Sequence, residues 1–546
     1  MNTKLTKKLA VVGAALVASL AITGITSTSA HAAPACAGTA LVQCQGVTSD
    51  GAPYVMQVPG NFNGTAFLYS HGYRYNIDIP AAVPLIGGYK VTNTPQPGPF
   101  PLTNSSDLTV MKYLLSKGYA IFGSGFAKQG WNTDSGLATD VELIKTFKEK
   151  FTTTKHVVAW GESLGGFITQ ALAEKHPELV DAVAPMCMAA GTVEAELTMA
   201  GDFLWGIKTF FDPSIKGGNY ANSAEAIGDL VKVFTIMGKL QKGIGTELVT
   251  GKPAWPDTTP AAVSGSALAS IPTRSVLLML GLMSGLPTQS AHFDGTTGPG
   301  SPNSSTYTSF ALAASPALAV LENGTTAAAL AVLVTADVEQ QAGGAIYDNT
   351  KTDYSARVAS EASVYNAGLS GSSAIAGMLG YLKVAPRVTG NAAAIAKMRS
   401  FVSHTGKINV PTITLAGTAD QVTPPGNTQL IAEKYAAQYE AAKAANIKAG
   451  KARGLPQLAN IWVVPPTHYT TFDATGSPVT STPPANGTTH CYFTAKQYIG
   501  VADLLAAAAT EGMPKPGKVA NVVRKMKGAI IDADFKPTLL KFYQAD

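Results

Sequence analysis

One serine stands between glycines in the segment HVVAWGESLGGF, residues 156–167. Gly161 and Gly165 lie two residues on either side of Ser163, with an apolar strand pattern before them and a helical pattern after them. A serine hydroxyl is a poor nucleophile unless a base lies within hydrogen-bond reach. A sharp turn from strand to helix would expose Ser163 to such a base. The spacing therefore predicts a nucleophilic serine, and the alternative is a chance match in a chain with 54 glycines.

A nucleophilic serine needs a histidine base and an acid that orients it. Asp420 ends the segment PTITLAGTAD, where a buried strand pattern leads into a turn, so it is the candidate acid; an ordinary turn aspartate is the alternative. Among the eight histidines, two follow the last predicted strand. His468 comes directly after it, and His490 lies in THCYFTAKQ just before the last predicted helix. From position alone, either could be the base.

The elements that must position these residues alternate between strand and helix. Continuously apolar strands separated by amphipathic helices indicate a mostly parallel sheet, with the strand C-termini at one edge. Two further strands are expected within residues 40–59. The predicted strands are 65–70, 119–123, 156–160, 181–188, 411–417 and 460–464, and the predicted helices are 108–117, 140–151, 167–175, 429–451 and 496–509.

The alternation stops after residue 188 and resumes near residue 411. The intervening segment is rich in Ala, Gly, Ser and Thr and has several helical patches. Because the strand and helix pattern resumes afterwards, we expect an inserted cap over the ligand edge of the sheet; a separate domain is the alternative. The predicted division is 1–32 as leader, 33–189 as the first part of the core, 190–400 as the cap and 401–546 as the second part of the core.

At these motifs the chain resembles the α/β-hydrolase superfamily. The resemblance is carried by residues 71–73 (HGY) after a strand, residues 161–165 (GESLG), Asp420 and His490, and it covers about residues 40–190 and 405–510. It implies an α/β fold with a mostly parallel sheet and a large inserted cap (lid), and its order of serine, acid and histidine matches this chain. The string around His490 is similar to the G-H-C-x-F-T pattern of secreted members, with Thr489 where glycine is usual. This similarity favours His490 over His468.

The resemblance also implies an oxyanion hole. The backbone N–H of Leu164 is one expected donor, and the N–H of Tyr73 is the other. His71 is then expected to be structural in its loop. Glu162, beside the serine, is expected to be a solvated turn residue, and contact with a substrate amine is the alternative.

The first residues have the pattern of a secretory signal peptide. Three lysines precede an apolar run, and residues 29–32 (SAHA) offer small residues at a cleavage site after Ala32. A membrane anchor or a lipid anchor at Cys36 is the alternative. Four cysteines in an exported chain suggest two disulfides, with Cys36 pairing with Cys44 and Cys187 pairing with Cys491. Two unpaired buried cysteines are the alternative to the second pair.

The bulk composition limits the partners. The formal net charge is +5, and loss of three leader lysines leaves +2, too little to argue for nucleic acid or anionic membranes. No span is expected after leader removal, no metal or organic cofactor is required, and the oligomeric state stays open.

The sequence therefore predicts a secreted serine hydrolase that cleaves carboxylic esters, of small-molecule or polymer origin, through an acyl-enzyme. Exported actinobacterial-type relatives in the superfamily include peptidases as well as esterases, so a peptidase or aminopeptidase is the first alternative. An acyltransferase and a non-catalytic binding protein on the same fold are the others.

Overall fold

The computed structural model describes residues 34–99, 109–448 and 457–544. Their strands form one ten-stranded sheet with the order β1-β2-β3-β5-β4-β6-β7-β8-β9-β10. The central strands from β5 to β9 run parallel, and antiparallel pairs complete both edges. The strands are β1 (Ala35–Ala37), β2 (Leu41–Val47), β3 (Pro53–Pro59), β4 (Thr65–Ser70), β5 (Ala120–Ser124), β6 (His156–Glu162), β7 (Ala182–Met186), β8 (Thr412–Gly417), β9 (Leu458–Val463) and β10 (Ala529–Ile530).

Helices cover both faces of this sheet, which is why its central strands are continuously apolar. Phe147 of α2 and Leu172 of α3 pack on one face. Leu114 of α1 and Leu505 of α14 pack on the other. The helices of this part are α1 (Thr109–Ser116), α2 (Thr133–Lys150), α3 (Leu164–Lys175), α13 (Gly426–Lys448), α14 (Ala495–Glu511) and α15 (Pro516–Val523).

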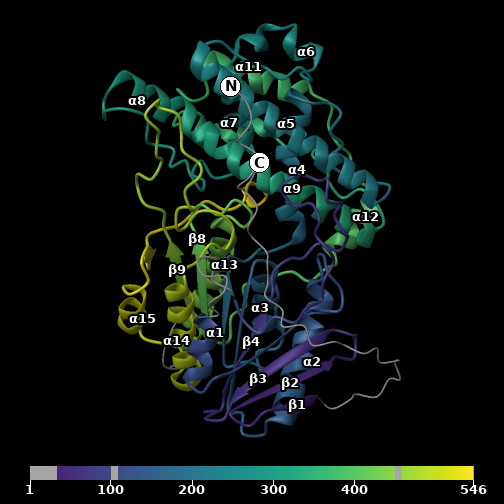
Figure 1. The fold of residues 1–546 in the computed structure, drawn as a ribbon, viewed down its shortest axis with the longest axis vertical. Helices are drawn as coiled ribbons and strands as arrows, with labels where there is room; N and C mark the ends of the chain where they lie inside the picture. The colour runs from purple at the N-terminus through teal and green to yellow at the C-terminus, as the bar shows by residue number, and fades with distance from the viewer. Residues whose placement is uncertain (1–33, 100–108, 449–456, 545–546) are drawn as a thin grey trace.

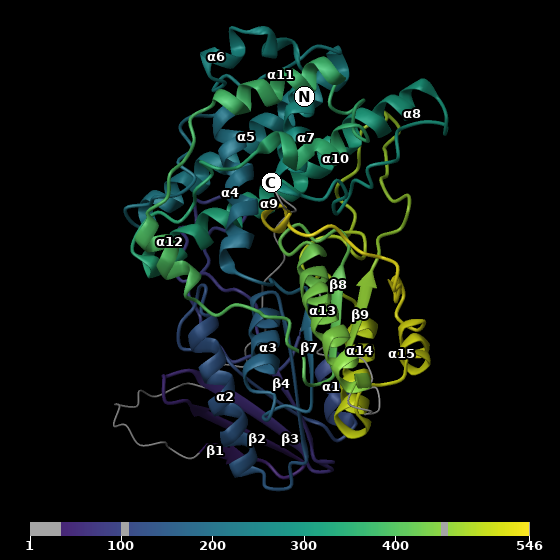
Figure 2. The ribbon, with the colours of Figure 1, turned by 180° about the vertical axis from the view of Figure 1, so that it is seen from behind.

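The chain between β7 and β8 is helical and lies above the edge toward which the arrows of β8 and β9 point (Figure 1). The view from behind shows the same layering (Figure 2). We call this region the cap. Its helices are α4 (Val193–Phe210), α5 (Ser223–Thr250), α6 (Ala261–Ser264), η1 (Ala267–Ser270), α7 (Thr273–Ser284), α8 (Ser305–Ser309), η2 (Phe310–Ala314), α9 (Ser315–Ala342), α10 (Tyr354–Ala362), α11 (Ser372–Val384) and α12 (Ala392–Arg399).

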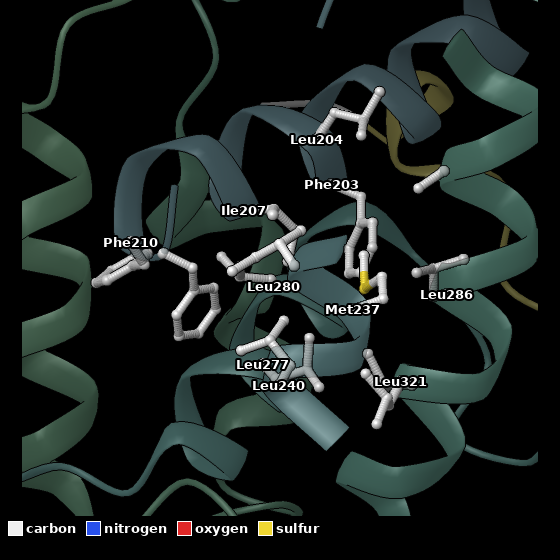
Figure 3. Packing of buried hydrophobic residues seen from close by; sticks show 14 of the residues in the cluster. Phe203, Leu204, Ile207, Phe210, Met237, Leu240, Leu277, Leu280, Leu286 and Leu321 are labelled. Atoms are coloured by element: carbon white, nitrogen blue, oxygen red, sulfur yellow. The ribbon is translucent and has the colours of Figure 1, made fainter. Parts of the chain in front are cut away.

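The cap has its own apolar core. Phe203 and Ile207 of α4 face Leu280 of α7, Met237 of α5 and Leu321 of α9 (Figure 3). Within the described residues, the continuous helical run Ser305–Ala342 is long and apolar enough to cross a membrane by length and composition. However, 72% of its most apolar window is buried inside the protein, so packing within the cap accounts for its composition.

Polar contacts at two acidic side chains of the cap, Asp337 and Glu361, help to fasten it to the remainder of the chain. Asp337 of α9 accepts hydrogen bonds from the backbone N–H of Trp131 and from the side chain of Asn76. The Lys541 ammonium, in η3 (Lys541–Tyr543), lies 2.7 Å from the Glu361 carboxylate of the cap. The C-terminal segment therefore reaches the cap, which the sequence pattern did not reveal.

The α/β architecture and the mostly parallel sheet agree with the prediction from sequence. The predicted strands are all present, although most of their ends are shifted. The elements that the prediction missed include β1, β10 and α15, because strands of two or three residues and an eight-residue helix carry little periodicity. The predicted leader, residues 1–32, lies outside the described residues. The predicted boundaries of the two core parts, residues 33–189 and 401–546, and of the cap, residues 190–400, stay a prediction.

Candidate active site

Ser163 lies at a one-residue turn between β6 and α3. Its backbone is in the left-handed region, with φ of 57°, and its N–H donates to the Met186 carbonyl at 3.1 Å. A Cβ on Gly165 would lie 1.9 Å from the Ser70 carbonyl oxygen, and one on Gly161 would lie 2.5 Å from the Gly165 carbonyl. Both positions therefore require glycine, because the turn presses its own backbone against β4.

Asp420 is fully buried just beyond the end of β8. One carboxylate oxygen accepts the N–H groups of Val422 and Thr423, each at 2.9 Å. The other accepts the N–H of Cys491 at 3.2 Å. A buried carboxylate is tolerated when it is hydrogen-bonded in this way.

His490 connects this acid to the serine. Its Nδ1 lies 3.0 Å from both Asp420 carboxylate oxygens, and its Nε2 lies 2.7 Å from the Ser163 hydroxyl oxygen. The carboxylate assigns the imidazole proton to Nδ1, which leaves Nε2 free to accept the proton of Ser163. The structure thus brings together the three residues that the sequence singled out.

His468, the alternative base, lies elsewhere. Its side chain is exposed, and its Nδ1 is 3.1 Å from the hydroxyl of Thr297 in the cap. His71 is 3% exposed, with Nδ1 2.7 Å from the Gly72 carbonyl. Burial, with a smaller effect of the Arg74 charge, lowers the pKa of His71 to about 3, so it stays neutral and fits the structural role predicted for it.

Both expected disulfides are present. Cys36 and Cys44 are cross-strand partners on β1 and β2. Cys187 and Cys491 are 304 positions apart in the sequence, and their Cα atoms lie 5.4 Å apart in the second disulfide. The second disulfide ties the segment that carries His490 to the end of β7, beside the serine turn.

The expected oxyanion donors lie next to Ser163. Leu164 is the first residue of α3, so its N–H is one of those that lack an intrahelical acceptor. Tyr73 borders the same pockets as Ser163 and its hydroxyl lies 3.5 Å from Asp337. Gly72 allows this loop to come close, because a Cβ there would be 3.3 Å from the Ser163 Cβ.

Glu162 differs from the solvated turn residue expected from sequence. Its carboxylate accepts hydrogen bonds from the hydroxyls of Tyr69 and Tyr498. Burial raises the pKa of Glu162, and the two tyrosine hydroxyls partly oppose that rise. The sequence pattern could not show this, because Tyr498 is on α14, more than three hundred residues away.

Two pockets meet at Ser163. The first, which we call the narrow pocket, has a volume of about 70 Å³ and lies beneath α4 and α9. The second, the wide pocket, has a volume of about 470 Å³ and includes His490 and Glu162 in its wall. Tyr73, Ser163, Leu330 and Val422 border both.

Glu196, in the first turn of α4, is the acidic residue in the wall of the narrow pocket. It is 9% exposed and accepts the N–H of Ala190 at 3.1 Å. Burial, and to a lesser extent the negative charge of Asp420, raises the pKa of Glu196 to about 8. Its carboxyl is therefore largely protonated at neutral pH, and the narrow pocket is close to uncharged.

Two groups of potential metal ligands were found in the described residues. One consists of Glu162, Cys187 and Cys491, and the other of Asp420, His490 and Cys491. Both depend on cysteine sulfurs that form a disulfide, and a disulfide sulfur is not the thiolate that binds metals.

The sheet order, the turn at Ser163 and the helical insertion before β8 define the architecture, and residues 110–216 match a family model described as the alpha/beta hydrolase fold. The chain has the α/β-hydrolase fold. The match spans β5, α2, β6, α3, β7 and α4, which is the part of the fold that carries Ser163.

Similarity of this α/β-hydrolase chain to solved structures is remote. An esterase from Aspergillus oryzae has 12% identity and a TM-score of 0.32, covering 77% of this chain and 71% of that chain. Feruloyl esterase B from Aspergillus oryzae has 10% identity and a TM-score of 0.31, covering 87% and 81%. The Pyrococcus furiosus esterase Pf2001 has 12% identity and a TM-score of 0.21, and the match covers 29% of this chain and 55% of that chain. No curated protein matches the chain.

The two disulfides offer a matched pair of variants. Replacing Cys187 and Cys491 together with alanine should lower kcat/KM for hydrolysis by about tenfold to a hundredfold, because the His490 segment loses its restraint near Ser163. Replacing Cys36 and Cys44 removes a disulfide between edge strands and should change kcat/KM by less than about twofold. Equal losses from both pairs in hydrolysis assays on the folded variants would contradict this role of the second disulfide.

The buried carboxyl of Glu196 predicts a pH-dependent stability. Its pKa is higher in the folded protein than the ordinary 4.5, so ionisation opposes folding as pH rises from about 4.5 to about 8. We expect the free energy of unfolding of wild type, relative to Glu196→Gln, to fall across this range and level off above it. Urea unfolding at several pH values measures the difference. The exposed Glu149→Gln on α2 controls for loss of one charge, and a pH-independent Glu196→Gln difference would contradict the assignment.

Proposed function

We propose that this protein is a secreted serine hydrolase that cleaves carboxylic esters through an acyl-enzyme intermediate. The proposal is carried by one observation, the continuous line from Asp420 through His490 to the Ser163 hydroxyl, with contacts of 3.0 and 2.7 Å. A serine, a histidine and a buried carboxylate in this order supply a nucleophile, a general base and a group that orients the base.

In the first half of the reaction, His490 Nε2 takes the proton of Ser163 as its oxygen bonds to the ester carbonyl carbon. The carbonyl oxygen becomes an oxyanion, and the N–H groups of Leu164 and Tyr73 are the donors that we assign to it. His490 then gives its proton to the leaving alcohol as the carbon–oxygen bond breaks. Asp420 keeps the imidazole in the required tautomer and stabilises its charged form.

In the second half, the same imidazole takes a proton from water, and the resulting hydroxide attacks the acyl carbon. The bond to Ser163 breaks, and His490 returns the proton to the serine oxygen. The acid product leaves, and the resting site is restored. Each step uses groups of this chain and one water molecule.

The hydrogen bonds of Glu162 favour an ester substrate over a peptide with a free N-terminus. A free α-amine would need an accessible carboxylate, and in the wide pocket both oxygens of Glu162 already accept a tyrosine hydroxyl. The mainly apolar wall of the narrow pocket likewise suits an uncharged acyl group. Export is supported by the two disulfides, which persist in oxidising compartments.

Single substitutions test the proposed triad. Using p-nitrophenyl acetate and butyrate, Ser163→Ala and His490→Ala should each lower kcat by about 10⁴-fold or more, because neither the nucleophile nor its base can be replaced in place. Asp420→Asn should lower kcat by about 10⁴-fold, since an amide no longer holds the His490 imidazole in the productive tautomer. His468→Ala serves as the matched control and should keep kcat within about twofold, because its side chain lies at the surface against the cap.

The contrary outcomes point to the alternatives. Loss of activity in His468→Ala with an active His490→Ala would reassign the base. Faster cleavage of amino-acyl p-nitroanilides than of esters would favour a peptidase, and dominant transfer to an added alcohol would favour an acyltransferase. A folded wild type that turns over none of these substrates would favour a binding protein.

A further inference from the structure

The two pockets at Ser163 differ in what their walls are made of. The narrow pocket is walled mainly by aliphatic side chains of two cap helices, including Leu197 and Met199 of α4 and Val334 of α9. The wide pocket has more aromatic side chains in its wall, among them Tyr69, Tyr75 and Phe234, together with aliphatic and polar side chains. A substrate that spans Ser163 would therefore place chemically different parts on its two sides.

Helix α9 separates the pockets by its periodicity. Ala327, Ala331 and Val334 recur at helical spacing and border the narrow pocket, whereas Ala329 borders the wide one. Residues two positions apart on a helix point in nearly opposite directions, so Ala329 and Ala331 face different pockets. Leu330 lies between them and borders both.

The groups around Ser163 set the direction of the substrate. Among these two walls, His490 belongs only to the wide pocket, and Leu164, an assigned oxyanion donor, belongs only to the narrow one. The leaving oxygen must receive its proton from His490 Nε2, so it has to face the wide pocket. The acyl substituent, on the other side of the tetrahedral carbon, then extends into the narrow pocket.

We infer that the narrow pocket takes the acyl part of the ester and the wide pocket takes its alcohol, so that the substrates are esters of short apolar acids with bulky aromatic alcohols. This inference rests on the proposed hydrolase function. The small volume of the narrow pocket limits the length of the acid, and its walls offer dispersion contacts to a short alkyl chain.

The wide pocket suits an aromatic alcohol for two reasons. Tyr73 and Tyr75 both border the pocket and make an edge-to-face contact with their ring centroids 6.0 Å apart. Tyr89, which is not part of the wall, packs edge-to-face against Tyr75 at 4.9 Å. Leu85 borders the same pocket while remaining 64% exposed, so the apolar surface continues outward to solvent. A large ring system could therefore bind and leave by this side.

Two buried alanines on α9 provide the matched test. Ala331→Leu places a larger side chain in the narrow pocket, and Ala329→Leu does the same in the wide one; the exposures of the two alanines are 3% and 7%. One substrate series varies the acid on a constant p-nitrophenol, from acetate through butyrate to octanoate. The other varies the alcohol on a constant acetyl group, from phenyl to 2-naphthyl acetate.

We expect wild type to favour acetate or butyrate over octanoate by about tenfold or more in kcat/KM. Ala331→Leu should lower kcat/KM for butyrate relative to that for acetate by a further factor of about ten. It should leave unchanged the ratio of kcat/KM for 2-naphthyl acetate to that for phenyl acetate. Ala329→Leu should lower the ratio of kcat/KM for 2-naphthyl acetate to that for phenyl acetate. It should leave the dependence of kcat/KM on acyl length unchanged. Ala331→Val and Ala329→Val repeat the test with a smaller side chain if a leucine variant fails to fold.

Burst kinetics provide an independent readout, because the acyl-enzyme no longer contains the alcohol. The deacylation rate constant for the butyryl-enzyme should change in Ala331→Leu and stay within about twofold of wild type in Ala329→Leu. The inference is overturned if the two variants exchange effects, if neither alters the acyl-length profile, or if wild type prefers octanoate. A wild type that hydrolyses no ester at all would instead overturn the proposed function.

Discussion

The buried carboxylate of Asp420 is the interaction on which the site depends. Its oxygens hold the N–H groups of its own turn and the N–H of Cys491, and they face Nδ1 of His490. A carboxylate without solvent is stable only with such partners, so the fold must keep these two distant segments together to satisfy it. The same contacts set the position of the imidazole. The Cys187–Cys491 disulfide restrains the segment that carries His490, and the close glycine turn fixes Ser163 at the other end of the hydrogen-bond line.

The cap supplies walls for the pockets at Ser163 that the sheet alone does not provide. A parallel sheet exposes its loops at the C-terminal edge, and here helices α4 and α9 cover that edge and wall the narrow pocket. Asp337 joins α9 to the N–H of Trp131 and to Asn76, so the roof is held against the loops that border Ser163. Glu196 of α4 lies in the same wall, and burial raises its pKa to about 8, so this carboxyl is largely neutral. A neutral group here is compatible with the oxyanion of the proposed mechanism.

Much of the site could be predicted from sequence because its signals are local. Gly161 and Gly165 reflect close backbone contacts within one turn, and Asp420 follows a buried strand by a few residues. His490 was harder, because Thr489 stands where glycine is usual. The structure gives Thr489 a φ of 58°, which explains why glycine suits that position and shows that threonine adopts the same backbone here.

The remaining features depend on contacts between distant segments. The hydroxyl of Tyr498 that holds Glu162, the reach of Lys541 into the cap and the walls of both pockets arise only when helices far apart in sequence meet. Because a single sequence does not show such contacts, Glu162 was expected to be a solvated turn residue. The pairing of β10 with β9 is equally nonlocal. The edge strand β1 pairs with its sequence neighbour β2, but a strand of two or three residues has too little pattern to be predicted.

In the proposed mechanism, Asp420 and His490 activate Ser163 as a nucleophile. Labelling the intact protein with a fluorophosphonate, followed by peptide mass spectrometry, tests this activation most directly. We expect one adduct, on the peptide that contains Ser163, with labelling slowed by orders of magnitude in His490→Ala. An adduct on another residue, no adduct on folded protein, or labelling of Ser163 at an unchanged rate without His490 would contradict it.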